Sequence, residues 1–326
     1  MLLIAYGTRP EWIKIKPIVD LLDKRHIPFR ILFTGQHTTL VSGKYDVNIT
    51  IKDGNNRLDS IFTSILNRND IFNNIDMVMV QGDTASALAV ALAAFHRKIK
   101  VIHLEAGLRS YDTNNPYPEE SYRRCISSMA SIHFCPTVQN KENLDREKIE
   151  GSKYVVGNTS IDSLVSLKNK TTSGGGCLIT LHRRENQALM SEWLKTLNKM
   201  AFDYKMKFTF ISHPNTDLTK LPNIENLNVI PPQTHDDILN LIIHSDIIIS
   251  DSGGIQEEAS YFRKPIIVCR TVTERPESVG TTSFMCNSPS NLIDIFNYVR
   301  TLNINDKPCP YGNGDSSTQI VNILYE

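Results

Sequence analysis

The alternation of short apolar runs with longer amphipathic segments constrains the fold of this chain more than any other feature. Six apolar runs precede a polar, glycine-rich break and five follow it, at residues 2–6, 29–34, 76–81, 100–104, 131–134 and 153–156, then 177–181, 207–212, 227–230, 246–250 and 265–269. Helical periodicity lies between many of them, as at residues 12–23, 58–66, 86–96, 121–129 and 235–244. Near-continuous apolar strands that alternate with helices predict an α/β fold with doubly wound parallel sheets.

The break at residues 168–176, KNKTTSGGG, divides the chain into two parts. Its composition is typical of a flexible linker, and no phosphate-binding G-x-x-x-x-G-K-[ST] pattern surrounds it. A length of 326 residues suits two domains at ~150 residues each, with one large α/β barrel as the competing count. We expect Rossmann-like domains at residues 1–168 and 177–306, and a C-terminal tail or helix at 307–326 that packs back on the first domain.

The charge balance argues against several classes of partner. The chain has 35 Lys and Arg against 35 Asp and Glu, with no basic run, so we expect no nucleic-acid partner and no polybasic membrane contact. No apolar stretch approaches the ~18 residues of a membrane span, and the first residues lack the basic region of a signal peptide. Six cysteines without a C-x-x-C pair read as reduced thiols, which favours a cytoplasmic protein.

Two common cofactor patterns are missing from the sequence. No G-x-G-x-x-G follows the first apolar run, so a dinucleotide cofactor is not expected. None of the nine histidines falls in H-E-x-x-H or in a His/Cys cluster, so no metal site is expected either.

Carboxylates follow neighbouring strands of the predicted first sheet. Asp83 comes just after the run at 76–81, Glu105 follows 100–104, and Glu119 and Glu120 open a helix after a proline-bracketed turn. Each alone could be a helix cap or a partner of a helix dipole. Because the carboxyl ends of parallel strands meet at one edge, several carboxylates there, with cations from the first helix nearby, predict acid–base chemistry on an anionic substrate.

The second domain carries a candidate anion site. Residues 251–258, DSGGIQEE, turn from a buried strand into a helix, and the small residues let a phosphate approach the free N–H groups of its first turn. Glu258 could accept hydrogen bonds from the two hydroxyls of a ribose, although Glu257 or Glu258 could also be a solvated first-turn residue. His182 and His213 stand at strand ends, where structural and functional roles are equally open.

Eight segments, taken in order, resemble the motif series of the non-hydrolysing UDP-N-acetylglucosamine 2-epimerases: GTRPEWIKIKP, VQGDTASALA, HLEAGLRS, PYPEESYRR, VGNTSID, LHRREN, SDSGGIQEEA and TERPE. The resemblance runs from Gly7 to about Glu277, and PYGNGDSS at 310–317 continues it. It implies a GT-B-like fold, with two Rossmann-type domains on either side of an interdomain active-site cleft, usually as a homodimer. It also implies inversion at C2 of a UDP-linked 2-acetamido sugar without NAD or a metal.

The resemblance assigns roles to particular residues. It implies that Asp83, Glu105 and Glu119 are acid–base groups and that His182 is important for turnover, without saying which carboxylate removes the C2 proton. Residues near the phosphates and sugar are Arg9, Lys14 and Arg123, and the UDP-binding set is His213, Ser252, Gly253, Gly254, Glu258 and Arg275, with Glu258 on the ribose. The implied reaction is anti elimination of UDP to a 2-acetamidoglucal, followed by re-addition to the opposite face.

The chain also departs from the family pattern. The segment between VGNTSID and LHRREN is shorter than in the family. Bacterial members often carry a second, activating UDP-N-acetylglucosamine site, of which Gln36 and His37 in TGQH are the remnant here. Thr38 and Thr39 stand where more polar or charged residues are usual, and Asn55 or Asn56 where an arginine is expected. These departures predict hyperbolic kinetics without substrate activation.

Other functions compete with this interpretation. A related UDP-2-acetamido or deoxy sugar is an alternative substrate, and a hydrolysing epimerase would release N-acetylmannosamine. A GT-B glycosyltransferase or a sugar-nucleotide-binding module comes from a different class. A transferase would need an acceptor and would not need three carboxylates at one edge, and a binding module would tolerate their loss.

Overall fold

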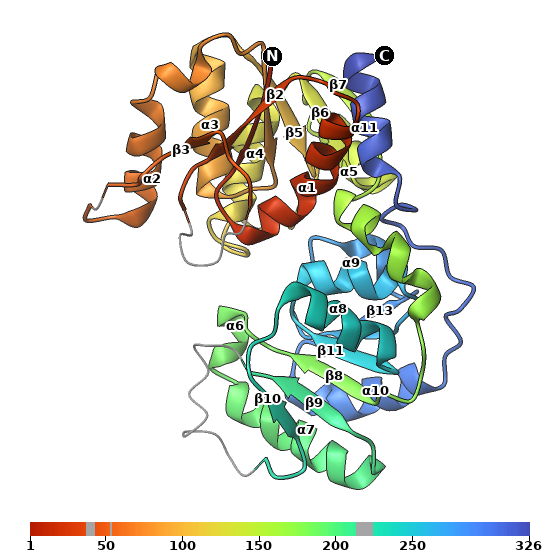
Figure 1. Ribbon diagram of the computed structural model, residues 1–326. Coiled ribbons are helices and arrows are strands. Elements are labelled where there is room, and N and C mark those ends of the chain that lie inside the picture. The colour runs from red at the N-terminus through yellow and green to blue at the C-terminus, as the bar shows by residue number, and fades with distance from the viewer. Residues whose placement is uncertain (37–42, 53, 213–223) are drawn as a thin grey trace. The chain divides into compact units, whose positions relative to one another are not determined.

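The computed structural model describes residues 1–36, 43–52, 54–212 and 224–326, which form two compact units (Figure 1). The first unit contains Met1–Ser163 and Tyr311–Glu326, and the second contains Leu164–Pro310. The chain therefore leaves the first unit, builds the second and returns to the first.

The first unit is built on a seven-stranded parallel sheet in the order β3-β2-β1-β4-β5-β6-β7. Its strands are β1 Leu2–Tyr6, β2 Phe29–Phe33, β3 Val47–Asn48, β4 Met77–Gln81, β5 Lys100–Leu104, β6 Ile132–Cys135 and β7 Ser152–Val155. Its helices are α1 Arg9–Lys24, α2 Arg57–Leu66, α3 Ala85–His96, α4 Glu119–Met129, α5 Val138–Arg146 and α11 Ser316–Tyr325, with a short 3₁₀ turn η1 at Asp70–Phe72. The strand order reverses between β1 and β4, which is where ligands of such sheets bind.

Side chains of β1 show why this sheet is covered on both faces. Leu3 and Ala5 belong to one buried cluster, which includes the alanine-rich helix α3. Leu2, Ile4 and Tyr6 belong to a second cluster, with residues of α1 and α11. Because successive strand residues point to opposite faces, five consecutive buried residues require a helix layer on each side.

The second unit has a six-stranded parallel sheet in the order β10-β9-β8-β11-β12-β13. Its strands are β8 Cys177–Thr180, β9 Phe208–Ile211, β10 Asn228–Ile230, β11 Ile247–Ser250, β12 Ile266–Val268 and β13 Ser283–Met285. Its helices are α6 Arg184–Gln187, α7 Met190–Tyr204, α8 His235–His244, α9 Gly253–Tyr261 and α10 Leu292–Arg300, with 3₁₀ turns η4 Pro276–Ser278 and η5 Pro289–Asn291. A 3₁₀ helix, η2 at Thr159–Lys170, spans the boundary between the units.

The predicted α/β fold class is confirmed, and the strands missing from the prediction are short. β3 and β13 add two and three residues at sheet edges, too few for a recognisable pattern. Helices begin slightly earlier than their periodicity suggests, because N-cap residues set the start. For example, α1 begins at Arg9, after the Thr8 side chain accepts a hydrogen bond from the Glu11 N–H.

The glycine-rich segment predicted as a linker is instead bound to the second unit. Asp246 accepts hydrogen bonds from the N–H groups of Gly174 (2.7 Å) and Gly176 (3.0 Å). A Cβ atom on Gly175 would lie 2.3 Å from the carbonyl oxygen of His244. These glycines therefore permit close packing against β11 and α8, and their composition does not signal a free tether.

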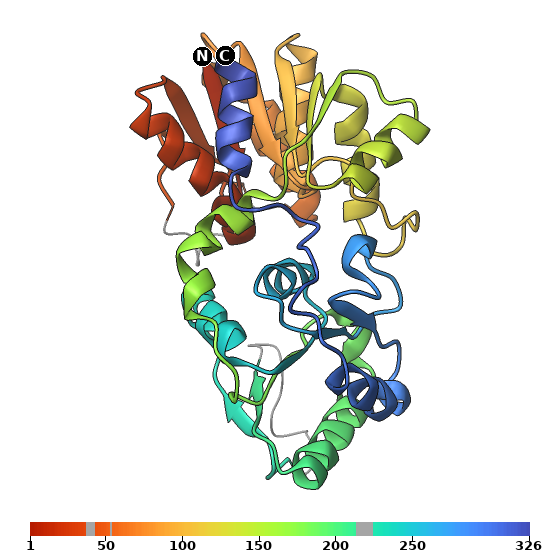
Figure 2. The same cartoon turned by 90° about the vertical axis from the view of Figure 1, so that its right-hand side faces the viewer.

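The last helix completes the first unit. α11 packs beside α1, and both chain ends lie on this unit (Figure 2). The Asp162 carboxylate accepts hydrogen bonds from the N–H groups of Ser316 (3.1 Å) and Ser317 (2.6 Å), which caps the start of α11. Ile320 and Val321 are fully buried in the core that α11 shares with β1.

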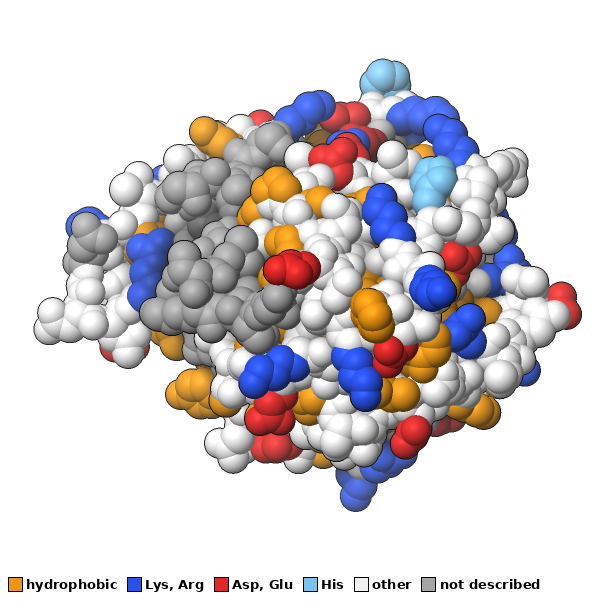
Figure 3. Space-filling view, turned by 90° about the horizontal axis from the view of Figure 1, so that it is seen from below, with side chains coloured by type: hydrophobic (Ala, Val, Ile, Leu, Met, Phe, Trp, Pro, Cys, Tyr) orange, Lys and Arg blue, Asp and Glu red, His pale blue; other side chains and the backbone are white. Residues whose placement is uncertain are grey.

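Surface charge follows the neutral balance of the sequence. On the face shown in Figure 3, Lys and Arg side chains are interspersed with Asp and Glu. Within the residues that the structure describes, the helices are all too short or too polar to cross a membrane.

Candidate functional site

Glu105 stands at the carboxyl edge of the first sheet, directly after β5. Its Oε1 accepts hydrogen bonds from Lys14 Nζ and from Asn158 Nδ2 (3.2 Å), and its Oε2 accepts one from Gln81 Nε2. The Glu105 backbone is left-handed, with φ +65°. Non-glycine residues adopt this conformation mainly where surrounding contacts hold them, often at functional sites. Donors from α1, β4 and the loop before η2 thus fix one carboxylate.

Asp83 follows the neighbouring strand β4 and is paired with Arg123 of α4. The Arg123 Nε lies 2.9 Å from Asp83 Oδ2, and its Nη2 bonds to the same oxygen. Arg123 Nη1 also lies 3.2 Å from Glu120 Oε2. One buried guanidinium therefore joins the end of β4 to the first turns of α4.

The adjacent residues Glu119 and Glu120 differ sharply in their surroundings. Glu120 is fully buried, and its carboxylate accepts hydrogen bonds from the N–H groups of Ser110 (3.0 Å) and Tyr111 (3.3 Å). Glu119 Oε2 is buried without a hydrogen-bond partner among the described residues. Glu120 thus holds a turn, whereas Glu119 has a buried carboxylate oxygen that no hydrogen bond from the described residues engages.

Glu11 is a buried carboxylate at this edge that the motifs did not single out. It accepts hydrogen bonds from the Gly7 N–H (3.0 Å), Thr8 Oγ1 (2.8 Å) and Thr84 Oγ1 (2.8 Å). Burial raises the pKa of Glu11. It ties the loop after β1 to the loop after β4, beside Asp83. The T-x-x-E spacing of a capping box was the signal available in the sequence.

His103 supports the same edge from within β5. Its Nε2 lies 2.8 Å from the carbonyl oxygen of Gly82, so Nε2 carries the proton and donates it. Full burial lowers the pKa of His103 to about 3, so the ring stays neutral. This bond fixes the turn that precedes Asp83.

The remaining first-unit candidates have local roles or none. Arg9 begins α1 and makes no hydrogen bond or ion pair with the described part of the chain. Gln36 Oε1 accepts hydrogen bonds from the N–H (3.1 Å) and Oγ (2.8 Å) of Ser86. Asn56 caps α2 through the N–H of Leu58 at 2.9 Å. His37, Thr38 and Thr39, predicted with Gln36 near a second sugar-nucleotide site, lie outside the described residues.

The start of α9 forms the candidate anion site at the carboxyl edge of the second sheet. Ser252 caps this nine-residue helix, and its Oγ accepts from the N–H of Ile255 (3.5 Å). A Cβ atom on Gly253 would lie 2.4 Å from Arg275 Nη1, whereas one on Gly254 would meet nothing closer than Ser252 Oγ at 3.9 Å. Gly253 therefore makes room for a guanidinium, and Gly254 leaves the helix start open to a ligand.

Arg275 belongs to a network of paired charges. Its Nε bonds to Glu257, and its Nη1 lies 2.7 Å from Glu274 Oε1. Glu274 Oε2 accepts from Arg270 Nη1 at 2.7 Å, and Arg270 Nε lies 3.0 Å from Glu185 Oε1. Paired carboxylates orient the Arg275 guanidinium beside the first turn of α9.

Glu258, the candidate ribose group, is paired with a histidine that the sequence reasoning missed. His235 Nε2 lies 2.8 Å from Glu258 Oε1. His235 begins α8, so only its position in a helix was apparent from the sequence. His182 follows β8 with a partly exposed side chain, and His213 lies outside the described residues.

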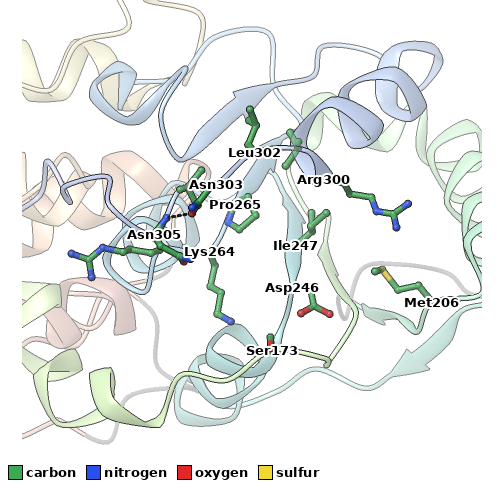
Figure 4. A pocket seen from close by; sticks show the side chains of 13 residues that line it. Ser173, Met206, Asp246, Ile247, Lys264, Pro265, Arg300, Leu302, Asn303 and Asn305 are labelled. Carbon is green, nitrogen blue, oxygen red and sulfur yellow. Dashed lines mark hydrogen bonds between the residues drawn. The ribbon is translucent and has the colours of Figure 1, made fainter.

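A pocket of about 300 Å³ lies at the opposite, amino-terminal edge of the second sheet (Figure 4). Lys264 Nζ bonds to the Thr172 carbonyl, and Asp246 holds the glycine-rich segment. Arg300 points away from both side chains. The polar groups of this pocket therefore serve packing, and the predicted site residues lie elsewhere. Among the residues that the structure describes, no three His, Cys, Asp or Glu side chains lie together as a metal site would require.

Comparison with known proteins decides the family. A family model described as UDP-N-acetylglucosamine 2-epimerase matches residues 20–325. This chain belongs to that family. The UDP-N-acetylglucosamine 2-epimerase of Neisseria meningitidis is 36% identical, with 99% of this chain and 98% of the relative covered. That of Campylobacter jejuni is 35% identical, covering 99% and 97%.

Solved structures agree with this assignment. The N. meningitidis UDP-GlcNAc 2-epimerase bound to UDP-GlcNAc has a TM-score of 0.85 at 34% identity, covering 99% of each chain. The S. aureus MnaA–UDP structure has a TM-score of 0.87 at 30% identity, covering 99% of this chain and 95% of the other. A Siraitia grosvenorii UGT transferase, at 10% identity and a TM-score of 0.59 over 100% and 99%, shares the fold alone. The predicted family and the GT-B-like fold are confirmed, and the chain is an epimerase, hence an isomerase.

Proposed function

We propose that the chain converts UDP-N-acetylglucosamine reversibly to UDP-N-acetylmannosamine by inversion at C2. Solved relatives support this substrate: the N. meningitidis enzyme is bound to UDP-GlcNAc, and the Methanocaldococcus jannaschii enzyme is in complex with UDP-GlcNAc and UDP. The proposal includes the non-hydrolysing course of the reaction, in which both products of bond cleavage stay bound until they recombine.

The observation that carries this proposal is the set of carboxylates at the first-sheet edge. Glu105 is held by three donors, Asp83 is paired with Arg123, and Glu119 has a buried oxygen without a partner among the described residues. Inversion at a carbon needs one group that removes a proton from one face and another that returns a proton to the opposite face. Several carboxylates in different settings at one edge supply both groups.

The proposed steps balance without an external oxidant. A carboxylate takes the C2 proton, and the C2–H electron pair forms a C1=C2 double bond. The C1–O bond breaks, and UDP leaves with that electron pair. UDP then attacks C1 of the bound 2-acetamidoglucal again, while a carboxylic acid gives a proton to the opposite face of C2. His182 takes part in turnover at the second-sheet edge.

The second unit is suited to retain UDP while it is detached. The free N–H groups at the start of α9 and the Arg275 guanidinium favour a diphosphate, and Glu258 is proposed to accept from the ribose hydroxyls. Lys14, Arg9 and Arg123 supply positive charge from the first unit. Preorganised donors of this kind stabilise both the ester and the departing anion.

Proton NMR of the purified protein with UDP-N-acetylglucosamine in D₂O, without added NAD or metal, tests the proposal. We expect signals of UDP-N-acetylmannosamine to grow and deuterium to enter C2 of both sugars. Free N-acetylmannosamine with UDP would instead establish the hydrolysing reaction. If nothing changes, a panel of other UDP-2-acetamido sugars is tested, and no turnover of any of them would refute C2 epimerisation.

We also propose hyperbolic kinetics without substrate activation. Gln36 accepts hydrogen bonds from Ser86, and Asn56 caps α2 at Leu58, which leaves both less able to bind a second sugar nucleotide. Initial rates should follow a single hyperbola over a wide range of UDP-N-acetylglucosamine. A sigmoidal curve that traces of UDP-N-acetylglucosamine relieve would contradict this.

We further propose that the enzyme is a cytoplasmic homodimer. The cytoplasmic location rests on six cysteines without a C-x-x-C pair, and the dimer on the family resemblance. Light scattering should give twice the mass of one chain, and a monomer at micromolar concentration would refute the dimer.

A further inference from the structure

Asp251 is a buried carboxylate at the second-sheet edge, directly after β11. Its Oδ2 accepts hydrogen bonds from the backbone N–H groups of His182 and Arg183 and from Asn186 Nδ2, each at 2.9 Å. β11 pairs with β8, so the residues that follow these strands are neighbours. Oδ2 thus holds the loop that carries His182, and Oδ1 adds a longer contact of 3.2 Å to the His182 N–H.

The other oxygen of Asp251 faces the His182 ring. His182 Nδ1 lies 3.2 Å from Asp251 Oδ1. The Asp251 side chain is 0% exposed, and that of His182 is 38% exposed. A hydrogen bond within this pair requires the proton on Nδ1, because a carboxylate oxygen of this kind accepts. A ring protonated on Nδ1 alone keeps its lone pair on Nε2.

Asp251 is itself held in place. Asn186 Nδ2 donates both to Asp251 Oδ2 and to the carbonyl oxygen of Cys269, at 2.9 Å each. Cys269 follows β12, the next strand of the sheet. Oδ1 shares the backbone N–H of His182 with Oδ2, and it also brings a fully buried acceptor to the imidazole, as in carboxylate–histidine pairs that set a tautomer.

We propose that Asp251 is a positioning residue for His182: it selects the Nδ1–H tautomer and directs Nε2 outward, where it is available to the reaction. This inference rests on the proposed function, because His182 affects turnover only if that proposal holds. Asp251 touches no reacting atom in this scheme and acts through the ring.

Nitrogen NMR of the histidine rings tests the pairing on the protein alone. In the wild type, the ring signals that disappear in His182→Ala should be those of an Nδ1-protonated tautomer. In Asp251→Asn, the three donors around Oδ2 keep the amide oxygen and turn the NH₂ group toward the ring, so the tautomer should change to Nε2–H. An Nε2–H ring in the wild type, or an unchanged Nδ1–H ring in a folded Asp251→Asn, would overturn the proposal.

A double-mutant cycle tests the link to turnover. Asp251→Asn should lower kcat on the order of 10²-fold with little change in KM, and Asp251→Asn combined with His182→Ala should be no slower than His182→Ala alone. If the two single losses of kcat multiply in the double variant, the residues act independently and the proposal is overturned. If His182→Ala turns over like the wild type, the role of His182 within the proposed function fails, and the tautomer measurement still decides the pairing.

Asp246→Asn is the matched control. Asp246 lies just before the same strand, β11, and likewise accepts hydrogen bonds from two backbone N–H groups, those of Gly174 and Gly176. It has no imidazole partner among the described residues. Its replacement should lower stability and leave both the His182 tautomer and kcat unchanged. An equal loss of kcat in both variants would assign Asp251 a purely structural role.

Discussion

Asp83 and Asp251 follow equivalent strands of the two sheets and differ in almost every other respect. β4 lies beside β1 and β11 lies beside β8, in each case where the strand order reverses. Asp83 is 26% exposed and paired with a guanidinium. Asp251 is fully buried and accepts hydrogen bonds from the backbone and Asn186. The doubly wound sheet fixes where a carboxylate stands, and the neighbouring side chains decide what it can do.

The two edges as a whole differ in the same way. The first-sheet edge gathers carboxylates with cations, which suits proton transfer. The second-sheet edge offers a glycine-bearing helix start with an oriented arginine, which suits a diphosphate. If this division is correct, substitutions of the first-edge carboxylates should alter turnover, and substitution of Glu258 at the second edge should alter nucleotide affinity. The Asp251–His182 pair is the exception at the second edge, since we expect it to affect turnover.

Glu105→Gln should have the largest effect and the most direct bearing on this division. We expect kcat to fall on the order of 10²–10⁴-fold, as for loss of an acid–base group, with UDP affinity nearly unchanged. Steady-state rates and calorimetry measure the two quantities. Asp76→Asn, an exposed carboxylate just before β4 at the far end of the sheet, should match the wild type. Normal turnover in Glu105→Gln would remove it from the acid–base set.

Glu258→Ala should lower the affinity for UDP. Loss of the hydrogen bonds that the ribose hydroxyls donate to this carboxylate is worth roughly 1.5–3 kcal/mol, so UDP should bind about 10- to 150-fold more weakly. Calorimetric titration with UDP measures this, and Glu192→Ala on the exposed surface of α7 is the control. Unchanged affinity would take Glu258 out of the ribose site.

Gly253→Ala and Gly254→Ala distinguish a glycine that makes room for Arg275 from a glycine that leaves the start of α9 open. The new methyl of Gly253→Ala would collide with Arg275 Nη1, so we expect a loss of about 1–3 kcal/mol in the free energy of unfolding. Gly254→Ala has space and should change that free energy little. Urea unfolding measures both. Equal losses would show that the Arg275 contact is not what requires a glycine.

His103→Gln tests the buried, neutral histidine that holds the Gly82 turn before Asp83. The pKa of His103 falls from 6.5 to about 3 on folding, so its stability contribution is complete above pH 6.5 and is lost as pH falls from 6.5 toward 3. At pH 5 the wild type should have lost about 2 kcal/mol through this residue. Glutamine keeps a donor for the Gly82 carbonyl and does not titrate.

The difference in unfolding free energy between pH 7.5 and pH 5 should therefore be smaller in His103→Gln by about that amount. Urea unfolding at the two pH values measures it. Equal pH dependence in the two proteins would show that His103 is not held neutral.

Strand-end residues could be predicted from sequence, whereas their supporting contacts could not. Asp83 and Glu105 were assigned to one edge because apolar runs mark where parallel strands end. The donors to Glu105 are distant in sequence, since Asn158 lies 53 positions away and Gln81 lies 24 positions away. No local pattern encodes such pairs.

Separation in sequence also explains the other contacts that could not be predicted. His235 lies 23 positions from Glu258 and showed only a helix start. Glu11 was visible within a motif, but its bond to Thr84 spans 73 positions. The glycine-rich segment was misjudged because composition does not show that Asp246, 72 positions from Gly174, accepts its N–H. Local sequence patterns determine where helices and strands form, whereas contacts between residues distant in sequence determine which polar groups are held in place.

The return of the chain to its first unit sets an order for folding during synthesis. Every residue of Leu164–Pro310 leaves the ribosome before Ile320 and Val321, which fill the core between α1 and β1. The second unit can thus fold while the first still lacks its last helix and leaves apolar surface of α1 uncovered. The domain begun first is completed last, and newly made chains are most exposed to aggregation in that interval.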